Sequence, residues 1–203
     1  EAVNFPAPVS RIPIMIGGGG LKKTLRMVAQ YADESNLTSR TLEEVAERLA
    51  ALDAHCERLG RNRSEIKVTK QMMVCVAPTM EEAHKDLEEI AVVKGWNNDL
   101  VEMMKAFILC GDSDTVGEKL TEFLNLGIDG FRLDAASYMP DEFVESIISR
   151  VRQVHSHVLF WGDGESYAET NSCFDAWFHH EAFYLAKQDL NAWKNLVESH
   201  QGN

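Results

Sequence analysis

Residues 12–32 read IPIMIGGGGLKKTLRMVAQYA, a pattern that predicts a strand, a glycine loop and a helix in succession. The apolar run from Ile12 to Ile16 is the expected strand, and four consecutive glycines follow it. The helix is indicated by apolar residues that recur at helical spacing, namely Leu21, Leu25, Val28, Ala29 and Ala32. A strand joined to a helix in this way opens a βα unit, which is typical of a parallel sheet.

The rest of the first 157 residues alternates in the same way. Thr41 and Glu44 form a capping box at the start of one helix, and Gly60 is placed to end it. We expect strands at residues 12–16, 35–37, 66–76 and 128–135, and helices at residues 21–32, 42–59, 79–93, 113–126 and 141–155. Because a complete (β/α)8 TIM barrel needs eight strands, the pattern predicts an α/β fold that is half of such a barrel, or a small open α/β sheet.

Residues 158–203 differ from this part in composition. They carry two Lys against seven Asp and Glu, and they hold three of the four tryptophans. We expect a mainly helical tail, with a helix from Asp175 to about Ser199 and no further alternation of strands and helices. The sequence therefore predicts two parts, a half-barrel at residues 1–157 and an acidic, aromatic-containing tail at residues 158–203.

Charge and cysteine content exclude several classes of protein. The chain carries 20 Lys and Arg against 32 Asp and Glu, a formal net charge of −12. Because no basic stripe is present to neutralise phosphates, nucleic acid is excluded as a partner. No apolar run approaches the ~20 residues that span a bilayer, so we expect no membrane segment. The cysteines lie far apart without a CxxC pair, which predicts free thiols in a reducing cytoplasm and neither a zinc site nor a disulfide framework: Cys56, Cys75, Cys110 and Cys173.

The strongest candidates for a binding site are the four glycines Gly17, Gly18, Gly19 and Gly20. Glycine lets backbone N–H groups approach a ligand closely, and the N-terminus of the following helix adds unpaired donors and partial positive charge. Lys22 and Lys23, expected just inside that helix, add further charge. These features predict a phosphate cradle, and the alternative is a tight turn between a closely packed strand and helix. Lys22 stands where the P-loop and GxGxxG patterns require glycine, so neither motif is present.

The run from Arg11 to Asn36, RIPIMIGGGGLKKTLRMVAQYADESN, resembles the luciferase-like oxidoreductases. Three later segments agree with that family in order, namely residues 56–66 (CERLGRNRSEI), 111–116 (GDSDTV) and 127–130 (GIDG). In the second of these, Asp112 and Ser113 stand where the family has Ser or Thr and then Pro. The resemblance covers about residues 4–157 and corresponds to the last four βα units of the family's TIM barrel.

The resemblance implies a function and a cofactor. The IGGGG-x-KKTL form is most similar to members assigned to the deazaflavin coenzyme F-420 rather than to flavin mononucleotide (FMN). The four glycines would then line the phosphate end of the cofactor. The implied activity is that of an oxidoreductase or monooxygenase that transfers a hydride between the cofactor and a small organic substrate, while the protein orients the cofactor. No family motif for a catalytic base lies in this chain, so the catalytic residue stays unknown.

The first half of the family's barrel has no counterpart in this sequence, so we expect a fragment. Two alternatives to the enzyme follow, a non-catalytic truncated half-barrel and a small phosphate-binding α/β domain. A lone half-barrel exposes strand edges and an apolar face, which favours association into a homo-oligomer.

Polar residues near strand ends are weaker candidates for the site. Ser35 and Asn36 lie at the end of a short strand, so we expect them to line a pocket at the carboxyl rim of the sheet. The alternative is that they only form hydrogen bonds within a loop. Arg132 and Asp134 alternate with apolar residues near the end of another strand, where we expect a structural ion pair. The alternative is that they line the pocket.

The remaining histidines and methionines are interpreted as structural. His55 and His84 are expected on solvated helix faces, and the pair Met72 and Met73 in the core. The adjacent residues 179 and 180 are both histidine, but their side chains would point about 100° apart on a helix, so we predict no metal site there.

Overall fold

A computed structural model of the chain describes residues 11–39, 41–105, 107–133, 139–164 and 173–179. Its centre is a seven-stranded sheet in which every strand pair is parallel. Six strands lie side by side in the order β1 (Met15–Gly17), β2 (Glu34–Leu37), β3 (Lys67–Val76), β5 (Gly130–Leu133), β6 (Leu159–Gly164) and β7 (Ala176–His179). The remaining strand, β4 (Ile108–Gly111), pairs with the second half of β3.

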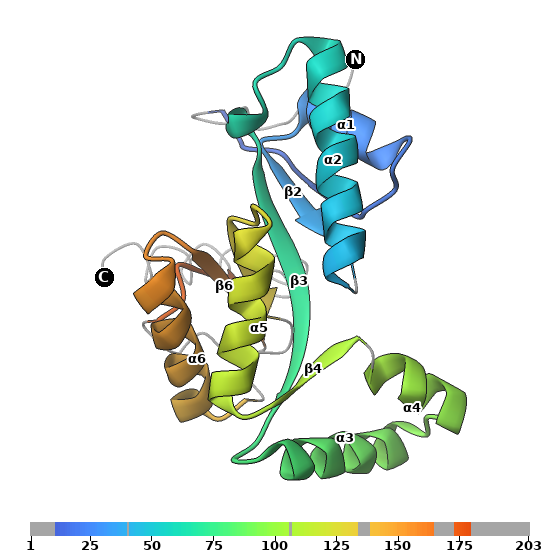
Figure 1. Ribbon diagram of the computed structural model, residues 1–203, viewed down its shortest axis with the longest axis vertical. Helices are drawn as coiled ribbons and strands as arrows, with labels where there is room; N and C mark the ends of the chain where they lie inside the picture. Colours follow the sequence, from blue (N-terminus) through green and yellow to red (C-terminus); the bar gives the residue numbers. More distant parts are fainter. Residues whose placement is uncertain (1–10, 40, 106, 134–138, 165–172, 180–203) are drawn as a thin grey trace, which may run out of the picture.

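The helices connect these strands and pack in pairs (Figure 1). They are α1 (Thr24–Tyr31), α2 (Leu42–Leu59), α3 (Met80–Lys94), α4 (Asn98–Lys105), α5 (Ser113–Asn125) and α6 (Asp141–Val154). Helices α1 and α2 lie side by side next to β2, and α5 lies beside α6. Figure 1 shows α3, α4 and β4 together at the far end of β3, where they form a distinct lobe. Among the described residues, no helix is long and apolar enough to cross a membrane.

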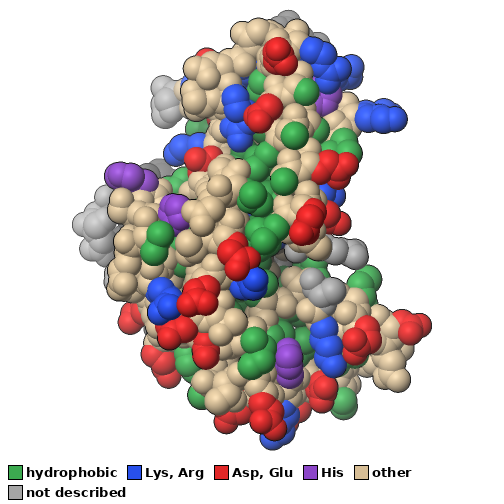
Figure 2. Space-filling view, in the orientation of Figure 1, with side chains coloured by type: hydrophobic (Ala, Val, Ile, Leu, Met, Phe, Trp, Pro, Cys, Tyr) green, Lys and Arg blue, Asp and Glu red, His purple; other side chains and the backbone are tan. Residues whose placement is uncertain are grey.

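Two hydrophobic clusters follow from this arrangement. The main core joins the sheet to α1, α2, α5 and α6, with Phe131 and Phe160 fully buried at its centre. A smaller cluster in the lobe is built around Cys75, Leu87 and Ile108. Figure 2 shows acidic side chains spread over the drawn face with basic ones among them, and a hollow between the part that carries α2 and the lobe.

Local sequence signals set the limits of several elements as expected. The Thr41 hydroxyl accepts a hydrogen bond from the Glu44 amide at 3.2 Å, and α2 ends at Gly60. Thr79 caps α3 in the same way. The expected strands at residues 35–37, 66–76 and 128–135 are confirmed as β2, β3 and β5, with small shifts at their ends.

The first strand and the first helix differ from expectation. Strand β1 begins at Met15, not at Ile12, because Pro13 has no N–H and the Ile14 amide donates to the Asp33 carboxylate at 2.8 Å. The predicted start of the helix at residue 21 is wrong, since a turn at residues 21–23 precedes α1. Lys22 and Lys23 therefore lie before the helix and are exposed.

The sequence analysis missed β4 and α4, because each is short, at four and eight residues. We expected the alternation of strands and helices to end after residue 157, and this expectation is also wrong. Strand β6 pairs with β5, and β7 forms at Ala176–His179, where a helix was expected to begin. Strand β6 forms because Val158 and Phe160 are buried in the main core. The expected helix beyond residue 179 lies outside the described residues, and the division at residue 157 stays a prediction.

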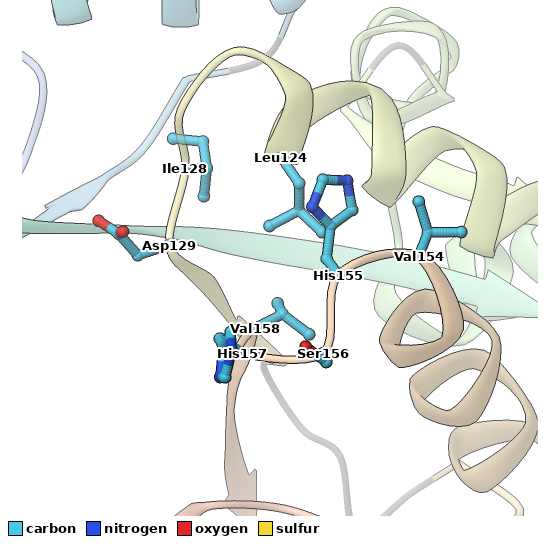
Figure 3. A pocket seen from close by; sticks show the side chains of 8 residues that line it. All are labelled: Leu124, Ile128, Asp129, Val154, His155, Ser156, His157 and Val158. Carbon is cyan, nitrogen blue, oxygen red and sulfur yellow. The ribbon is translucent and has the colours of Figure 1, made fainter.

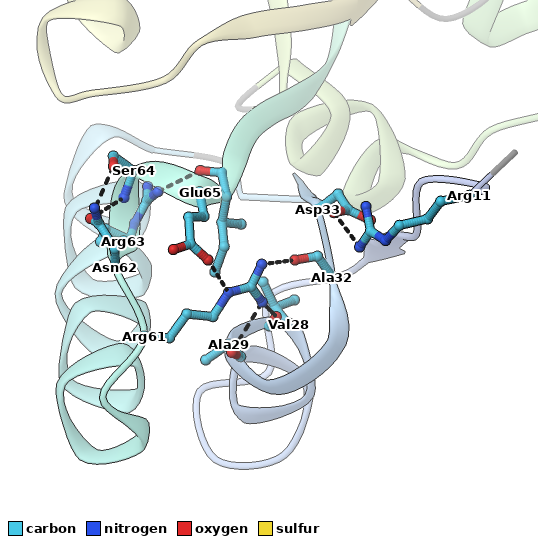
Figure 4. Close-up of polar contacts among 11 residues, drawn as sticks. Arg11, Val28, Ala29, Ala32, Asp33, Arg61, Asn62, Arg63, Ser64 and Glu65 are labelled. Carbon is cyan, nitrogen blue, oxygen red and sulfur yellow. Dashed lines mark hydrogen bonds and ion pairs between the residues drawn. The ribbon is translucent and has the colours of Figure 1, made fainter.

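An arginine beyond α2 fastens the first βα unit to the rest of the fold (Figure 4). The Arg61 guanidinium donates to the carbonyl oxygens of Val28, Ala29 and Ala32 at 3.3, 3.1 and 2.7 Å. Val28 and Ala29 lie in the last turn of α1 and Ala32 caps its end, where the helix dipole favours a cation. Arg61 thus holds α1 in place, and with it the glycine loop that precedes α1.

Candidate functional site

The glycine loop lies at the carboxyl end of β1, the edge of a parallel sheet at which active sites form. Gly17 ends the strand, and the Gly18 amide donates to the Asn36 carbonyl at 2.9 Å. Gly18 has φ of +110°, a conformation that side chains rarely adopt. The amides of Gly19 and Gly20 have no acceptor among the described residues, so they remain donors for a ligand.

Arg48 of α2 packs directly against this loop. A Cβ on Gly19 would lie 2.8 Å from Arg48 Cδ and would overlap Nε as well, so a larger residue there would displace the arginine side chain from the loop. Arg48 Nη1 donates to the Glu44 carbonyl at 2.9 Å. Its Nε is buried without a hydrogen-bond partner in the described part of the chain. The guanidinium also lies 3.7 Å from the Glu44 carboxylate, so Arg48 brings one unused donor, and not an unpaired charge, to the loop that holds the two unused amides.

Sequence reasoning missed Arg48, because 28 positions separate it from Gly20 and helical periodicity shows it only as a polar residue of α2. Its placement depends on the packing of α2 against α1. Arg48 thus adds a charged group at the loop that the sequence did not indicate, while Lys22 and Lys23 lie in the turn between the loop and α1 and not inside the helix.

Ser35 and Asn36 lie on β2 beside the loop, and both are buried. The Asn36 amide donates to Thr69 Oγ1 at 2.9 Å, and the Thr69 hydroxyl donates to Glu34 Oε1 at 2.6 Å. Burial raises the pKa of the Glu34 carboxyl, against the hydrogen bond from Thr69, which lowers it. Ser35 Oγ has no hydrogen-bond partner among the described residues. Lining of a pocket by Ser35 and Asn36 stays a prediction.

A buried lysine lies one residue beyond Thr69. Lys70 is 2% exposed, and its Nζ donates to the Gln71 carbonyl at 3.1 Å and contacts Met72 Sδ at 2.8 Å. The ammonium also lies 4.9 Å from the centre of the Phe123 ring of α5. Burial lowers the pKa of Lys70 to about 8. The sequence offered no sign of this burial, because lysine is ordinarily exposed.

A mainly apolar cavity of about 760 Å³ lies further along β3, toward its carboxyl end. Its walls come from the second half of β3, from α3, and from the start of α6 at Phe143, with Trp96 and Ile108 between them. Its volume lies in the range that holds a small organic molecule.

A smaller hollow of about 330 Å³ lies at the opposite, amino end of β5 and β6 (Figure 3). Asp129, His155 and His157 line it, but Figure 3 shows that their side chains point in different directions. The polar side chains of this hollow therefore do not converge on a point where one ligand could bind.

Several other sequence expectations are resolved by the structure. The expected solvation of His55 is wrong: it is 7% exposed, and its Nε2 lies 2.7 Å from the Leu21 carbonyl, because α2 packs that face against the turn before α1. His84 is exposed and Met72 is buried, as expected. Asp134, the expected partner of Arg132, lies outside the described residues, as does the second histidine of the pair at 179–180.

In the part of the chain that is described, no three His, Cys, Asp or Glu side chains cluster as a metal site would require.

Comparison with known proteins identifies one family. Residues 1–130 match the family model described as luciferase-like monooxygenase. Among solved structures, an F420-dependent secondary alcohol dehydrogenase in complex with an F420-acetone adduct is similar at a TM-score of 0.53, with 15% identity over 65% of this chain. Riboflavin lyase (RcaE), with modified FMN and riboflavin, is similar at a TM-score of 0.54, with 16% identity over 78% of this chain. The chain spans 46% and 45% of these two proteins, so the likeness confirms an α/β fold that is part of a TIM barrel.

A curated alpha-amylase from Thermomonospora curvata also matches a short stretch. It is 39% identical over 54 residues, which are 27% of this chain and 8% of the amylase. A match of this length assigns no family.

Proposed function

Since the chain belongs to the luciferase-like monooxygenase family, we propose that it forms the cofactor-binding half of an oxidoreductase. This enzyme would transfer a hydride between coenzyme F-420, or alternatively FMN, and a small organic substrate. F-420 is preferred because the IGGGG-x-KKTL form resembles members assigned to that cofactor. The proposal rests above all on Arg48, whose buried Nε lacks a partner among the described residues beside the loop of Gly17–Gly20.

The residues present fit the phosphate group that both cofactors carry. The amides of Gly19 and Gly20 supply two donors, and the Arg48 guanidinium supplies a charge-assisted donor. The Gly18 hydrogen bond to Asn36 holds the loop in shape before any ligand arrives. The cofactor, when bound, supplies the redox chemistry.

The other residues of the site would position the reacting partners. The side chains of Glu34, Thr69 and Asn36 form a buried, hydrogen-bonded chain between β2 and β3 beside the loop. The mainly apolar cavity further along β3 offers a place for an organic substrate. We assign no catalytic base, since no side chain among the described residues touches both the glycine loop and the apolar cavity.

Titration of the chain with F-420 and with FMN, followed by cofactor fluorescence, tests the proposal. Removing one charge-assisted hydrogen bond costs about 1.5–3 kcal/mol, so Arg48→Ala should weaken binding by about 10- to 100-fold. The matched control is Arg150→Ala, because Arg150 pairs with Asp114 and Glu118 of α5 and not with the loop. It should bind as the unmodified chain does.

Equal affinities of the unmodified chain and Arg48→Ala would refute the role of Arg48. Failure of the unmodified chain to bind either cofactor would favour the non-catalytic half-barrel. Binding of inorganic phosphate without either cofactor would favour the small phosphate-binding domain.

A further inference from the structure

Strands β3 and β4 bring together two cysteines that lie 35 positions apart. Cys75 and Cys110 are register partners in this parallel pair, so their side chains point to the same face of the sheet. Adjacent strands run about 4.8 Å apart, which lies inside the range of about 4.4–6.8 Å between the Cα atoms of disulfide-bonded cysteines. Both cysteines are free thiols in the structure.

The two thiols differ in their chemistry. A hydrogen bond between the two side chains lowers the pKa of Cys110, assisted by the charge of Lys105. The same hydrogen bond and burial raise the pKa of Cys75, whose Sγ also lies 3.2 Å from the Ala83 carbonyl oxygen. Cys110 is also the less buried of the two. Because the thiolate is the nucleophile, Cys110 is the thiol that attacks first.

We propose that Cys75 and Cys110 form a reversible disulfide when the chain meets an oxidised low-molecular-weight disulfide such as glutathione disulfide. The Cys110 thiolate attacks one sulfur of this oxidant, and the first glutathione leaves as a thiolate that takes up the proton lost by Cys110. The Cys75 sulfur then attacks the Cys110 sulfur in the mixed disulfide. The second glutathione leaves and takes up the proton of Cys75. Two protein thiols are oxidised, and one external disulfide is reduced to two thiols.

The position of this bond gives it a structural effect. The strand pairing of β4 is with β3, so a covalent link there fastens the lobe of α3, α4 and β4 to the main sheet. Cys75 also lines the apolar cavity. Oxidation therefore acts on a wall of the cavity and on the attachment of the lobe at the same time, independently of any cofactor.

Reaction of the reduced, folded chain with glutathione disulfide tests the proposal. Intact mass and maleimide labelling should show two of the four thiols lost together, with a mass decrease of two hydrogens. Digestion without reduction should yield a linked peptide that contains both cysteines, and dithiothreitol should reverse the change. Cys75→Ala should leave Cys110 as a lasting glutathione adduct. Cys110→Ser should slow the reaction at Cys75 by at least about 10-fold.

The matched control is Cys173→Ser, because Cys173 is a partly buried thiol outside the β3–β4 pair. It should form the disulfide as the unmodified chain does. The proposal is overturned if the unmodified chain retains a glutathione adduct on Cys110 without losing the second thiol. It is also overturned if the linked peptide appears only after the chain has been unfolded in urea.

Discussion

Replacement of Lys70 by methionine should stabilise the chain. Lys70 is 2% exposed, and its ammonium contacts one carbonyl, one thioether and the face of Phe123. The described contacts of its ammonium include no carboxylate, although Glu44 acts on it from a distance. A buried charge without a close counter-ion is costly, whereas methionine keeps a side chain of similar length that already suits this core.

The size of the effect follows from the lowered pKa. A fall from 10.5 to about 8 corresponds to about 3 kcal/mol against the charged form, at ~1.36 kcal/mol per unit. Because a methionine at this position would lose the hydrogen bond and the contact with the Phe123 ring, we expect a net gain of about 2 kcal/mol at pH 7.

The pH dependence supplies an independent check of the cause. Between pH 8 and 10.5 the unfolded chain binds more protons at Lys70 than the folded chain does, so the stability of the unmodified protein rises with pH in this window. The advantage of Lys70→Met should therefore be full below pH 8 and vanish near pH 10.5. Urea unfolding, followed by circular dichroism at pH 7 and at pH 10.5, measures the free energy of unfolding of the unmodified chain and of the variant. Lys67→Met, at an exposed position of the same strand, is the matched control and should change stability by less than about 0.5 kcal/mol.

Two results would refute this reasoning. The first is a destabilised Lys70→Met variant that is otherwise folded. The second is a gain that is equal at pH 7 and pH 10.5, since the gain would then come from packing and not from the removed charge.

Three further predictions concern the loop, its anchor and the assembly. Gly18→Val and Gly19→Val should abolish binding of F-420 or FMN through the phosphate, because of the positive φ at the first and the Arg48 side chain at the second. Unchanged affinity in both valine variants, while they remain folded, would mean that the loop is only a turn. Arg61→Ala should lower the free energy of unfolding by about 2–3 kcal/mol, measured by urea unfolding, because three carbonyls of α1 lose a charged donor; an unchanged midpoint would contradict it. The chain should sediment as a dimer or larger species, because β1 is an end strand of the sheet, and a folded monomer at high concentration would rule this out.

Local signals in the sequence were enough to predict much of the fold. The capping box at Thr41, the stop at Gly60 and the apolar run of β3 each act within a few residues, so their structure depends little on the rest of the chain. The glycine loop was recognised for the same reason, since its backbone freedom is a property of the residues themselves. The local signals for β4, β6 and β7 are weak, so these three strands were not predicted.

Tertiary structure alone decided which distant residues meet. Arg48 reaches Gly19 because α2 packs on α1, and Cys75 faces Cys110 because of the register between β3 and β4. Lys70 is buried because α5 covers its side of the sheet. None of these contacts has a local signature, since a residue's neighbours across a sheet or between helices are set by strand register and helix packing. The arginine at the loop, the thiol pair and the buried ammonium are therefore properties of the folded chain, whereas the glycine loop itself was already evident in residues 17–20.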